Sequence, residues 1–146
     1  MKSNIRRYKP SDEKAFFELC LSQWYERNTY NIFEYPGLDP WTWIDHKLYN
    51  NDYIVLVDDS LQGFICGHRD ENSMEVEHLY VSPSKRREGL AFALKRKLEE
   101  VAKQEGCSLI YTYNKIDNDN SRKLNIKAGW KIEPYNNEYY RSSKKL

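Results

Sequence analysis

The feature of the sequence that most constrains the fold is a change of hydrophobic period just after residue 81. Three apolar segments at 52–59, 61–70 and 74–81 follow one another with only short polar turns between them, which predicts three consecutive strands joined as hairpins. From Leu90 onward the apolar residues recur at helical spacing instead. We therefore expect a β-meander that runs directly into an amphipathic helix.

This predicted helix has one apolar face and one charged face. Its apolar residues fall at positions i, i+4, i+8 and i+11, a spacing that places them on the side facing a sheet: Leu90, Leu94, Leu98 and Val101. The opposite, polar face is predicted to carry the charged residues Lys95, Arg96, Glu99, Glu100 and Lys103. Gly106 is expected to end the helix.

Hydrophobic periods and capping signals predict the remaining elements. Ser11 is a candidate N-cap for a helix that runs through Arg27, and Asp39 with Pro40 would begin a short helix over 41–50. The strands expected outside the meander are 5–9, 108–113, 130–134 and 137–142, and a helix over 121–128 stops at Gly129. The order βααβββαβαββ predicts a layered α/β fold of the α+β kind, in a single domain over residues 1–146.

Composition argues against several classes of protein. The 23 basic and 22 acidic residues nearly balance, so a nucleic-acid partner is not expected from overall charge. The three cysteines are widely spaced without a CxxC pair, and the three histidines lack ligand spacing, which predicts neither a disulfide framework nor a metal site. The N-terminus lacks the apolar run of a signal peptide, and no stretch of about 18 apolar residues occurs. We therefore expect a cytoplasmic protein with no membrane partner.

Gly89 suggests that the turn before the helix approaches a ligand. The start of a helix offers unpaired backbone N–H groups and the positive end of the helix dipole, which attract an anion that can come close. Gly89 and Ala91 are small, and Lys85, Arg86 and Arg87 add positive potential around them. A diphosphate site is one interpretation, and a solvated basic turn is the other. No GxxxxGK[ST] or GxGxxG string occurs, which argues against a nucleotide kinase and a dehydrogenase.

Two motifs in the second half of the chain resemble the GNAT N-acetyltransferase superfamily. VEHLYVSPSKRREGLAFALKRKLEE, at 76–100, resembles its acetyl-CoA-binding core, in which R/Q-x-x-G-x-G/A follows a strand ending in V-x-P. A second family pattern is matched by Asn118, Ser121, Leu124 and Gly129–Trp130. The resemblance implies the GNAT acyl-CoA N-acyltransferase fold, a mixed and mostly antiparallel sheet flanked by about four helices. It also implies direct transfer of the acetyl group of acetyl-CoA, the cosubstrate, to an amine acceptor, without a metal.

The resemblance also implies which residues bind the cosubstrate. The family holds the CoA pyrophosphate with the backbone amides of the loop and the first helical turn, which here are Arg87, Glu88, Gly89, Leu90, Ala91 and Phe92, with Arg86 opening the motif. The pantetheine arm would pair with the backbone of Leu79, Tyr80 and Val81, and an N–H near Leu79 would polarise the acetyl carbonyl. Asn118 would help to hold the cosubstrate.

The catalytic base and acid are less closely specified. Several family members carry the base at the positions that match Glu75 or Glu77, and we prefer Glu77 because it lies closer to the acetyl end. Simple alternation along 74–81 places Glu75 and Glu77 on one face and His78 on the other, so that His78 points away. Asn125 stands where many members have the tyrosine that protonates the CoA thiolate, and asparagine cannot do so. Tyr113, Tyr111 or water would then supply the proton.

The acceptor is not determined by the sequence. The expected acceptor region, the first two helices and the late hairpin, is rich in aromatic residues that either line a slot or belong to the core: Trp24, Tyr25, Tyr30, Phe33, Tyr35, Trp41, Trp43, Tyr135, Tyr139 and Tyr140. Acidic residues there, among them Glu26, would suit an amine, whether of a small molecule, a protein N-terminus or a lysine. Two alternatives stay open: a CoA-binding sensor without turnover, and an acyltransferase that acts on a macromolecule such as aminoacyl-tRNA. Homodimerisation through the sheet or the late hairpin is compatible with either.

Overall fold

The computed structural model describes residues 4–29 and 42–146. Within them a seven-stranded sheet has the order β1-β2-β3-β4-β5-β7-β6. Its strands are β1 (Ile5–Arg7), β2 (Tyr53–Asp58), β3 (Gly63–Asp70), β4 (Ser73–Val81), β5 (Leu109–Lys115), β6 (Lys131–Pro134) and β7 (Tyr139–Lys145). β4 and β5 pair in parallel, whereas the other neighbouring strands pair antiparallel. The sheet is therefore mixed and mostly antiparallel, as predicted.

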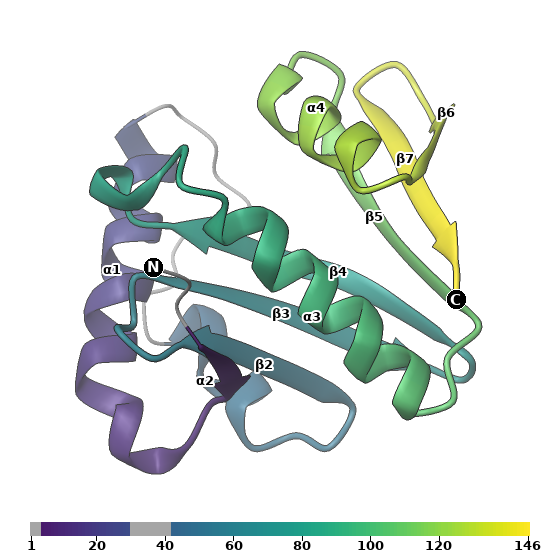
Figure 1. The fold of residues 1–146 in the computed structure, drawn as a ribbon. Helices are drawn as coiled ribbons and strands as arrows, with labels where there is room; N and C mark the ends of the chain where they lie inside the picture. Colours follow the sequence, from purple (N-terminus) through teal and green to yellow (C-terminus); the bar gives the residue numbers. More distant parts are fainter. Residues whose placement is uncertain (1–3, 30–41) are drawn as a thin grey trace.

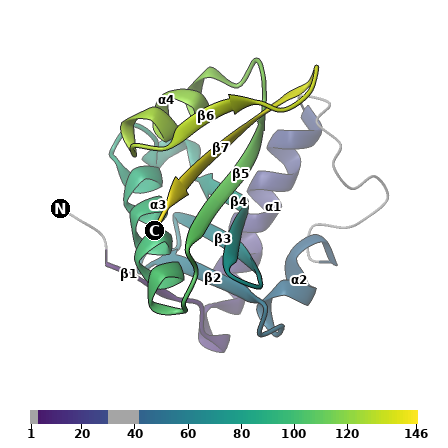
Figure 2. The same cartoon turned by 90° about the vertical axis from the view of Figure 1, so that its right-hand side faces the viewer.

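Helices cover both faces of this sheet, and Figure 2 shows the three layers edge-on. They are α1 (Glu13–Thr29), α2 (Thr42–Leu48), α3 (Leu90–Gln104) and α4 (Asp119–Lys127). α3 and α4 lie on one side, and α1 and α2 lie on the other. The predicted order βααβββαβαββ is confirmed. The predicted start of the second helix, at Asp39 and Pro40, lies outside the described residues.

The predicted cap of the first helix is wrong. Residues Pro10–Asp12 form a short 3-10 turn, and α1 begins only at Glu13. The carboxylate of Asp12 accepts the backbone N–H of Lys9 at 2.9 Å and a bond from Arg6 at 2.8 Å. Asp12, rather than Ser11, therefore satisfies a free N–H at this turn, because its side chain is also held by an arginine from β1.

The core consists of two apolar clusters, one on each face of the sheet. On one face Leu94 and Leu98 of α3 pack against residues such as Ile65 and Met74. On the other face Phe16 and Leu19 of α1 pack against residues that include Phe64, with the Phe16 and Phe64 ring centres 5.1 Å apart. β2, β3 and β4 are buried between these clusters, which makes them the rigid part of the molecule.

β4 and β5 diverge from each other halfway along their length, as Figure 1 shows. Their paired residues run only from Ser73↔Leu109 to Glu75↔Tyr111. Just beyond the last pair, the hydroxyl of Thr112 donates a bond to the backbone oxygen of Val76 at 3.0 Å. Past this bond the two strands separate, and the edges that face each other carry backbone groups free of the β4–β5 ladder.

Candidate active site

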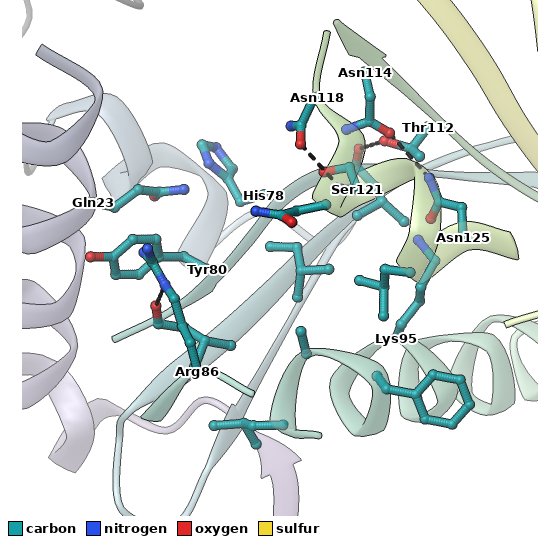
Figure 3. Close-up of a pocket in the computed structure, with 18 of the residues that line it drawn as sticks. Gln23, His78, Tyr80, Arg86, Lys95, Thr112, Asn114, Asn118, Ser121 and Asn125 are labelled. Atoms are coloured by element: carbon teal, nitrogen blue, oxygen red, sulfur yellow. Dashed lines mark hydrogen bonds between the residues drawn. The ribbon is translucent and has the colours of Figure 1, made fainter. Parts of the chain in front are cut away.

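A cleft of about 1030 Å³ begins where β4 and β5 separate. The start of α3, the start of α4 and one side of α1 complete its walls. Figure 3 shows polar side chains from these elements converging on the cleft, among them Gln23, His78, Asn118 and Asn125. Its size is in the upper range for a ligand site in a protein, and it offers space for an elongated molecule.

The loop that leads into α3 curls its backbone toward this cleft. Arg87 and Gly89 have positive φ values of 67° and 85°, and only glycine adopts this conformation without strain. A Cβ added to Gly89 would meet nothing within 4 Å. The first helical bond of α3 joins Ala93 N–H to Gly89 O at 3.0 Å, so that the N–H groups of the preceding turn have no partner within the helix. The arrangement fits an anion that lies against these amides.

Arg86 braces this loop against the sheet and α1. Its Nε donates to the backbone oxygen of Val81 at 2.9 Å, and its Nη2 donates to the Glu26 carboxylate at 2.7 Å. The same Glu26 oxygen accepts the hydroxyl of Tyr80 at 3.0 Å. The bond to Glu26 raises the pKa of Arg86, which is charged at every physiological pH. Sequence reasoning placed Glu26 near the acceptor, whereas the structure ion-pairs it with the cosubstrate loop.

The predicted cosubstrate residues gather around the cleft, with one exception. Those that line it are Leu79, Tyr80, Val81, Arg86, Arg87, Gly89, Leu90, Ala91, Phe92 and Asn118. Glu88, within the same loop, is not among the lining residues. Asn118 also caps α4, because its side-chain oxygen accepts the backbone N–H of Ser121 at 3.1 Å.

A bulge in β4 overturns the prediction that Glu77 and His78 point to opposite faces. Cys66 pairs with His78 and the next residue, Gly67, pairs with Val76, so that Glu77 is left without a partner in β3. The extra residue shifts the alternation by one position. Both side chains consequently meet Lys47 of α2, whose Nζ lies 3.0 Å from Glu77 Oε2 and 2.9 Å from His78 Nε2.

Lys47 is a site residue that sequence reasoning missed. It belongs to no motif, and it lies 31 positions before His78 in the chain. Its side chain is only 4% exposed, and Glu77 is 22% exposed. The ion pair fixes the Glu77 carboxylate at the edge of the cleft, where Glu77 and His78 are both lining residues. The carboxylate can accept a proton from a ligand that occupies the cleft.

Glu75 lies outside the lining of the cleft. Its carboxylate accepts the hydroxyl of Tyr111 at 3.5 Å, and the side chain is partly buried. Burial, followed by the nearby charge of Glu77, raises the pKa of Glu75 above its ordinary value. Of the two glutamates that the sequence proposed as base, only Glu77 therefore has direct access to the cleft.

Tyr113, a predicted candidate for the acid, and Asn125, which stands at the position of the family's tyrosine, differ in their surroundings. Tyr113 lines the cleft, and its ring centre lies 4.6 Å from that of Tyr135. Asn125 is buried, and its amide nitrogen donates to Asn114 Oδ1 at 3.3 Å and to Ser142 Oγ at 3.1 Å. Asn125 therefore joins α4 to β5 and β7 and has no ionisable proton to give.

Lys95 and Glu99 contradict the prediction of an exposed polar face on α3. Lys95 is 1% exposed and Glu99 is buried as well, because Trp130 and β7 pack against this face. Lys95 Nζ lies 3.5 Å from the centre of the Trp130 ring, and Trp130 Nε1 donates to Glu99 at 2.9 Å. Burial lowers the pKa of Lys95 to about 7. This amine also lines the cleft.

Two negative findings concern the described residues alone. They contain no helix of the length and apolar character that a membrane span requires. They also contain no group of three or more histidine, cysteine, aspartate or glutamate side chains that could hold a metal ion.

Comparisons with known proteins agree with this geometry. A search of curated proteins finds no match. Among solved structures, the chain is similar to the PaiA N-acetyltransferase from Thermoplasma acidophilum in complex with coenzyme A, with 22% identity, a TM-score of 0.77 and full coverage of both chains. It is similar to the GNAT domain of S. lividans PAT, with 13% identity, a TM-score of 0.81 and coverage of 99% of this chain and 90% of that one. These likenesses show the fold.

The sequence itself matches a family model. The model of the acetyltransferase (GNAT) family matches residues 16–130. A further structural neighbour, the ribosomal-protein-S18-alanine N-acetyltransferase from Escherichia coli, has 14% identity and a TM-score of 0.72, and covers 99% of this chain and 94% of its own. Because the family model spans most of the sequence, from α1 through the end of α4, this chain belongs to the acetyltransferase (GNAT) family and is an acyl-CoA-dependent N-acetyltransferase.

Proposed function

We propose that the protein transfers the acetyl group of acetyl-CoA directly to an amine that enters between α1, α2 and β4. The observation that carries this proposal is the continuity of the cleft. One lining runs from the anion-binding geometry at Gly89, along Leu79 to Val81 of β4, to the carboxylate of Glu77. A thioester donor and its acceptor can therefore meet within one cleft.

The start of α3 would hold the diphosphate of the cosubstrate. The free amides of the loop and the first helical turn face an anion, and the positive φ at Gly89 with open space beside it allows close approach. Lys85, Arg86 and Arg87 also line this end of the cleft and add positive charge. Acetyl-CoA supplies the chemistry as an activated thioester.

β4 would position the reacting end of the cosubstrate, the pantetheine arm with its acetyl group. Beyond the pair Glu75↔Tyr111 this strand no longer pairs with β5, so its backbone can bond to an extended pantetheine arm as a further strand would. An N–H near Leu79 lies next to the bulge at Glu77 and would donate to the oxygen that becomes negative in the transition state. Removal of such a donor costs about 3–4 kcal/mol of transition-state stabilisation in comparable sites.

Glu77 would act as the base on the acceptor side. Alkylamines titrate near 10.4, so an acceptor amine arrives protonated and must lose a proton before it attacks. Glu77 is the predicted base that reaches the cleft, and Lys47 holds its carboxylate in place. Gln23 of α1 also lines the cleft, and within the described residues its buried Oε1 has no hydrogen-bond partner. This oxygen is suited to accept an N–H of the acceptor.

The release of free thiol from acetyl-CoA, measured against a panel of amines, tests this proposal. The panel should contain polyamines, amino acids, aminoglycosides and peptides with free N-termini or lysines, with calorimetric binding of CoA on the same sample. Release that depends on an amine is the expected result. Tight CoA binding without release from any amine would support the sensor alternative, and an absence of CoA binding would refute the proposal.

A further inference from the structure

We propose that Lys95 donates the proton to the sulfur of CoA when the thioester bond breaks. The proposal rests on the proposed acetyl transfer and names its proton donor, which Asn125 cannot be. Asn125 carries no ionisable proton, and its amide nitrogen bonds to Asn114 and Ser142. Lys95 is a buried amine in the wall of the same cleft.

The packing of α3 on the sheet places Lys95 at the reacting end of the cleft. Leu90 and Leu94 pack over Gly63, which pairs with Val81, and Leu98 packs over Gly67, which pairs with Val76. Lys95 follows Leu94 in the helix, so it stands beside the stretch of β4 between Val81 and Val76. This stretch contains Glu77 and Leu79, where the acetyl group would lie. A helix rises 1.5 Å per residue, so Lys95 lies about 9 Å along α3 from Gly89.

The side chain extends from α3 toward α4. Figure 3 shows Lys95 directed toward Asn125, the position from which a tyrosine would otherwise reach the sulfur. Trp130 contacts both residues: its ring lies under the Lys95 amine, and its backbone N–H donates to the backbone oxygen of Asn125 at 2.9 Å. Because asparagine is shorter than tyrosine, we infer that the Lys95 side chain forms this part of the cleft wall.

Among the described residues no carboxylate forms a direct ion pair with the Lys95 amine, although the charge of Glu99 opposes the effect of burial on the Lys95 pKa. Glu99 is the nearest acid on α3, but its oxygens bond to Trp130 Nε1 at 2.9 Å, Lys144 Nζ at 2.7 Å and Arg96 Nη1 at 3.2 Å. Lys144 of β7 bonds to Glu99, and Lys127 of α4 lies over the Phe92 ring. The other charged residues that line the cleft are Glu26, Glu77, Lys85, Arg86, Arg87, Lys115 and Asp117. Lys95 is thus a desolvated cation with a proton available for an incoming anion.

The protonation of Lys95 suits a proton donor at neutral pH. With a pKa of about 7, the protonated and neutral forms are present in similar amounts. The acceptor amine, made neutral when its first proton passes through Glu77 to solvent, attacks the carbonyl carbon. The new C–N bond forms, and the C–S bond breaks with its electron pair on sulfur. Lys95 gives its proton to that sulfur, Glu77 takes the proton that the acceptor nitrogen loses, and both groups re-equilibrate with solvent.

The variant Lys95→Met tests this role, with Lys97→Met as its matched control. Methionine matches the length of the lysine stem and removes a buried charge, so the variant should fold. Lys97 lies on the same helix, is 38% exposed and pairs only with Glu100 among the described residues. We expect Lys95→Met to lower kcat at least about tenfold, while the KM for acetyl-CoA and the Kd of CoA stay within about twofold of wild type. Wild-type kcat is expected to fall above pH 7 as Lys95 loses its proton, and Lys95→Met should lack this fall. Lys97→Met should behave as wild type.

A second measurement does not require turnover. The ultraviolet absorbance of the thiolate, followed against pH in the CoA complex, gives the pKa of the bound thiol. Because a thiolate and the Lys95 ammonium would stabilise each other, the two groups titrate as a pair, and thiolate absorbance should begin to rise at a lower pH in wild type than in Lys95→Met. Wild-type kcat, pH profile and thiol pKa in Lys95→Met would overturn the proposal, as would weaker CoA binding at unchanged kcat. If wild type turned over no amine, the proposed function would fail, and the thiol pKa would still decide whether Lys95 faces the sulfur.

Discussion

At the residue scale, one irregularity, the bulge in β4, determines where the Glu77 side chain lies. The bulge beside Gly67 turns Glu77 and His78 to the same partner, Lys47. A Cβ at Gly67 would lie 2.6 Å from the sulfur of Met74, so glycine is required where the strands change register. The sequence located the glutamate through its resemblance to a family, but the bulge depends on packing between two strands and leaves no periodic signal.

The two candidate bases should differ in their effect on catalysis. Glu77→Gln removes the carboxylate that lines the cleft and should lower kcat about 100-fold without a change in the Kd of CoA. Glu75→Gln should lower kcat much less, because Glu75 lies outside the lining. Steady-state kinetics with any active amine, and calorimetry with CoA, give both values. A larger loss in Glu75→Gln than in Glu77→Gln would assign the base to Glu75.

Lys95 should also control how stability depends on pH. Its pKa is lowered to about 7 in the folded protein from 10.5, so the unfolded chain binds more protons between these two values. Stability therefore rises with pH from about 7 to about 10.5, and the cost of the buried charge is largest below pH 7. Lys95→Met removes this cost and should be more stable at pH 6 by about 1–4 kcal/mol. The gain should shrink as the pH approaches 10.

Denaturant unfolding at pH 6, 8 and 10 measures this difference, and Lys97→Met serves again as the control. A Lys95→Met protein that is less stable than wild type at pH 6 would show that the amine has a stabilising partner. Sequence reasoning assigned Lys95 to the polar face of α3, because helical periodicity identifies only the face that packs against the sheet. Lys95 and Glu99 are covered by Trp130 and Lys144, which lie far along the chain, and such contacts do not alter the periodicity of α3.

At the scale of elements, the hydrophobic period and the turn residues were sufficient to predict the order of the strands and helices. β2, β3 and α3 are each strongly periodic or continuously apolar, and the glycine that follows α3, Gly106, has a φ of 90° as expected of a C-terminal stop. The separation of β4 from β5 could not be predicted, since the length of a pairing depends on both strands. The separation nevertheless creates the cleft.

Thr112 marks the inner end of that separation. It is buried, and its hydroxyl bonds to the backbone oxygen of Val76 at 3.0 Å. Thr112→Val keeps the shape and removes this bond, which should cost about 1–2 kcal/mol of stability because the Val76 oxygen is left without the bond. Thr112→Ser, which keeps the hydroxyl, should cost less. Hydrogen exchange of the amides of β4 and β5 should be faster in Thr112→Val, and unchanged exchange would show that other contacts hold the two strands together at this point.

On the scale of the whole molecule, two layers of helices enclose a sheet that opens on one side to bind a ligand. The Glu26–Arg86 ion pair ties α1 to the loop before α3, so the acceptor layer and the cosubstrate loop share a contact at 2.7 Å. The motifs led to most of the residues that line the cleft around the start of α3, because they involve backbone geometry within one stretch of chain. The expected acceptor region, α1, α2 and the late hairpin, is formed by side chains that meet only in the folded structure, and part of it lies outside the described residues.

Calorimetric titration of CoA into wild type, Gly89→Asp and Gly106→Asp decides whether the cleft at the start of α3 holds the CoA diphosphate. Aspartate tolerates positive φ better than most residues, and both glycines have open space around them. Gly106 lies beyond the far end of α3, about 25 Å along the helix axis. A carboxylate at position 89 should weaken CoA binding at least about 100-fold, the loss of about 3 kcal/mol of amide–phosphate bonding. Gly106→Asp should bind as wild type does, whereas wild-type affinity in Gly89→Asp would contradict the account.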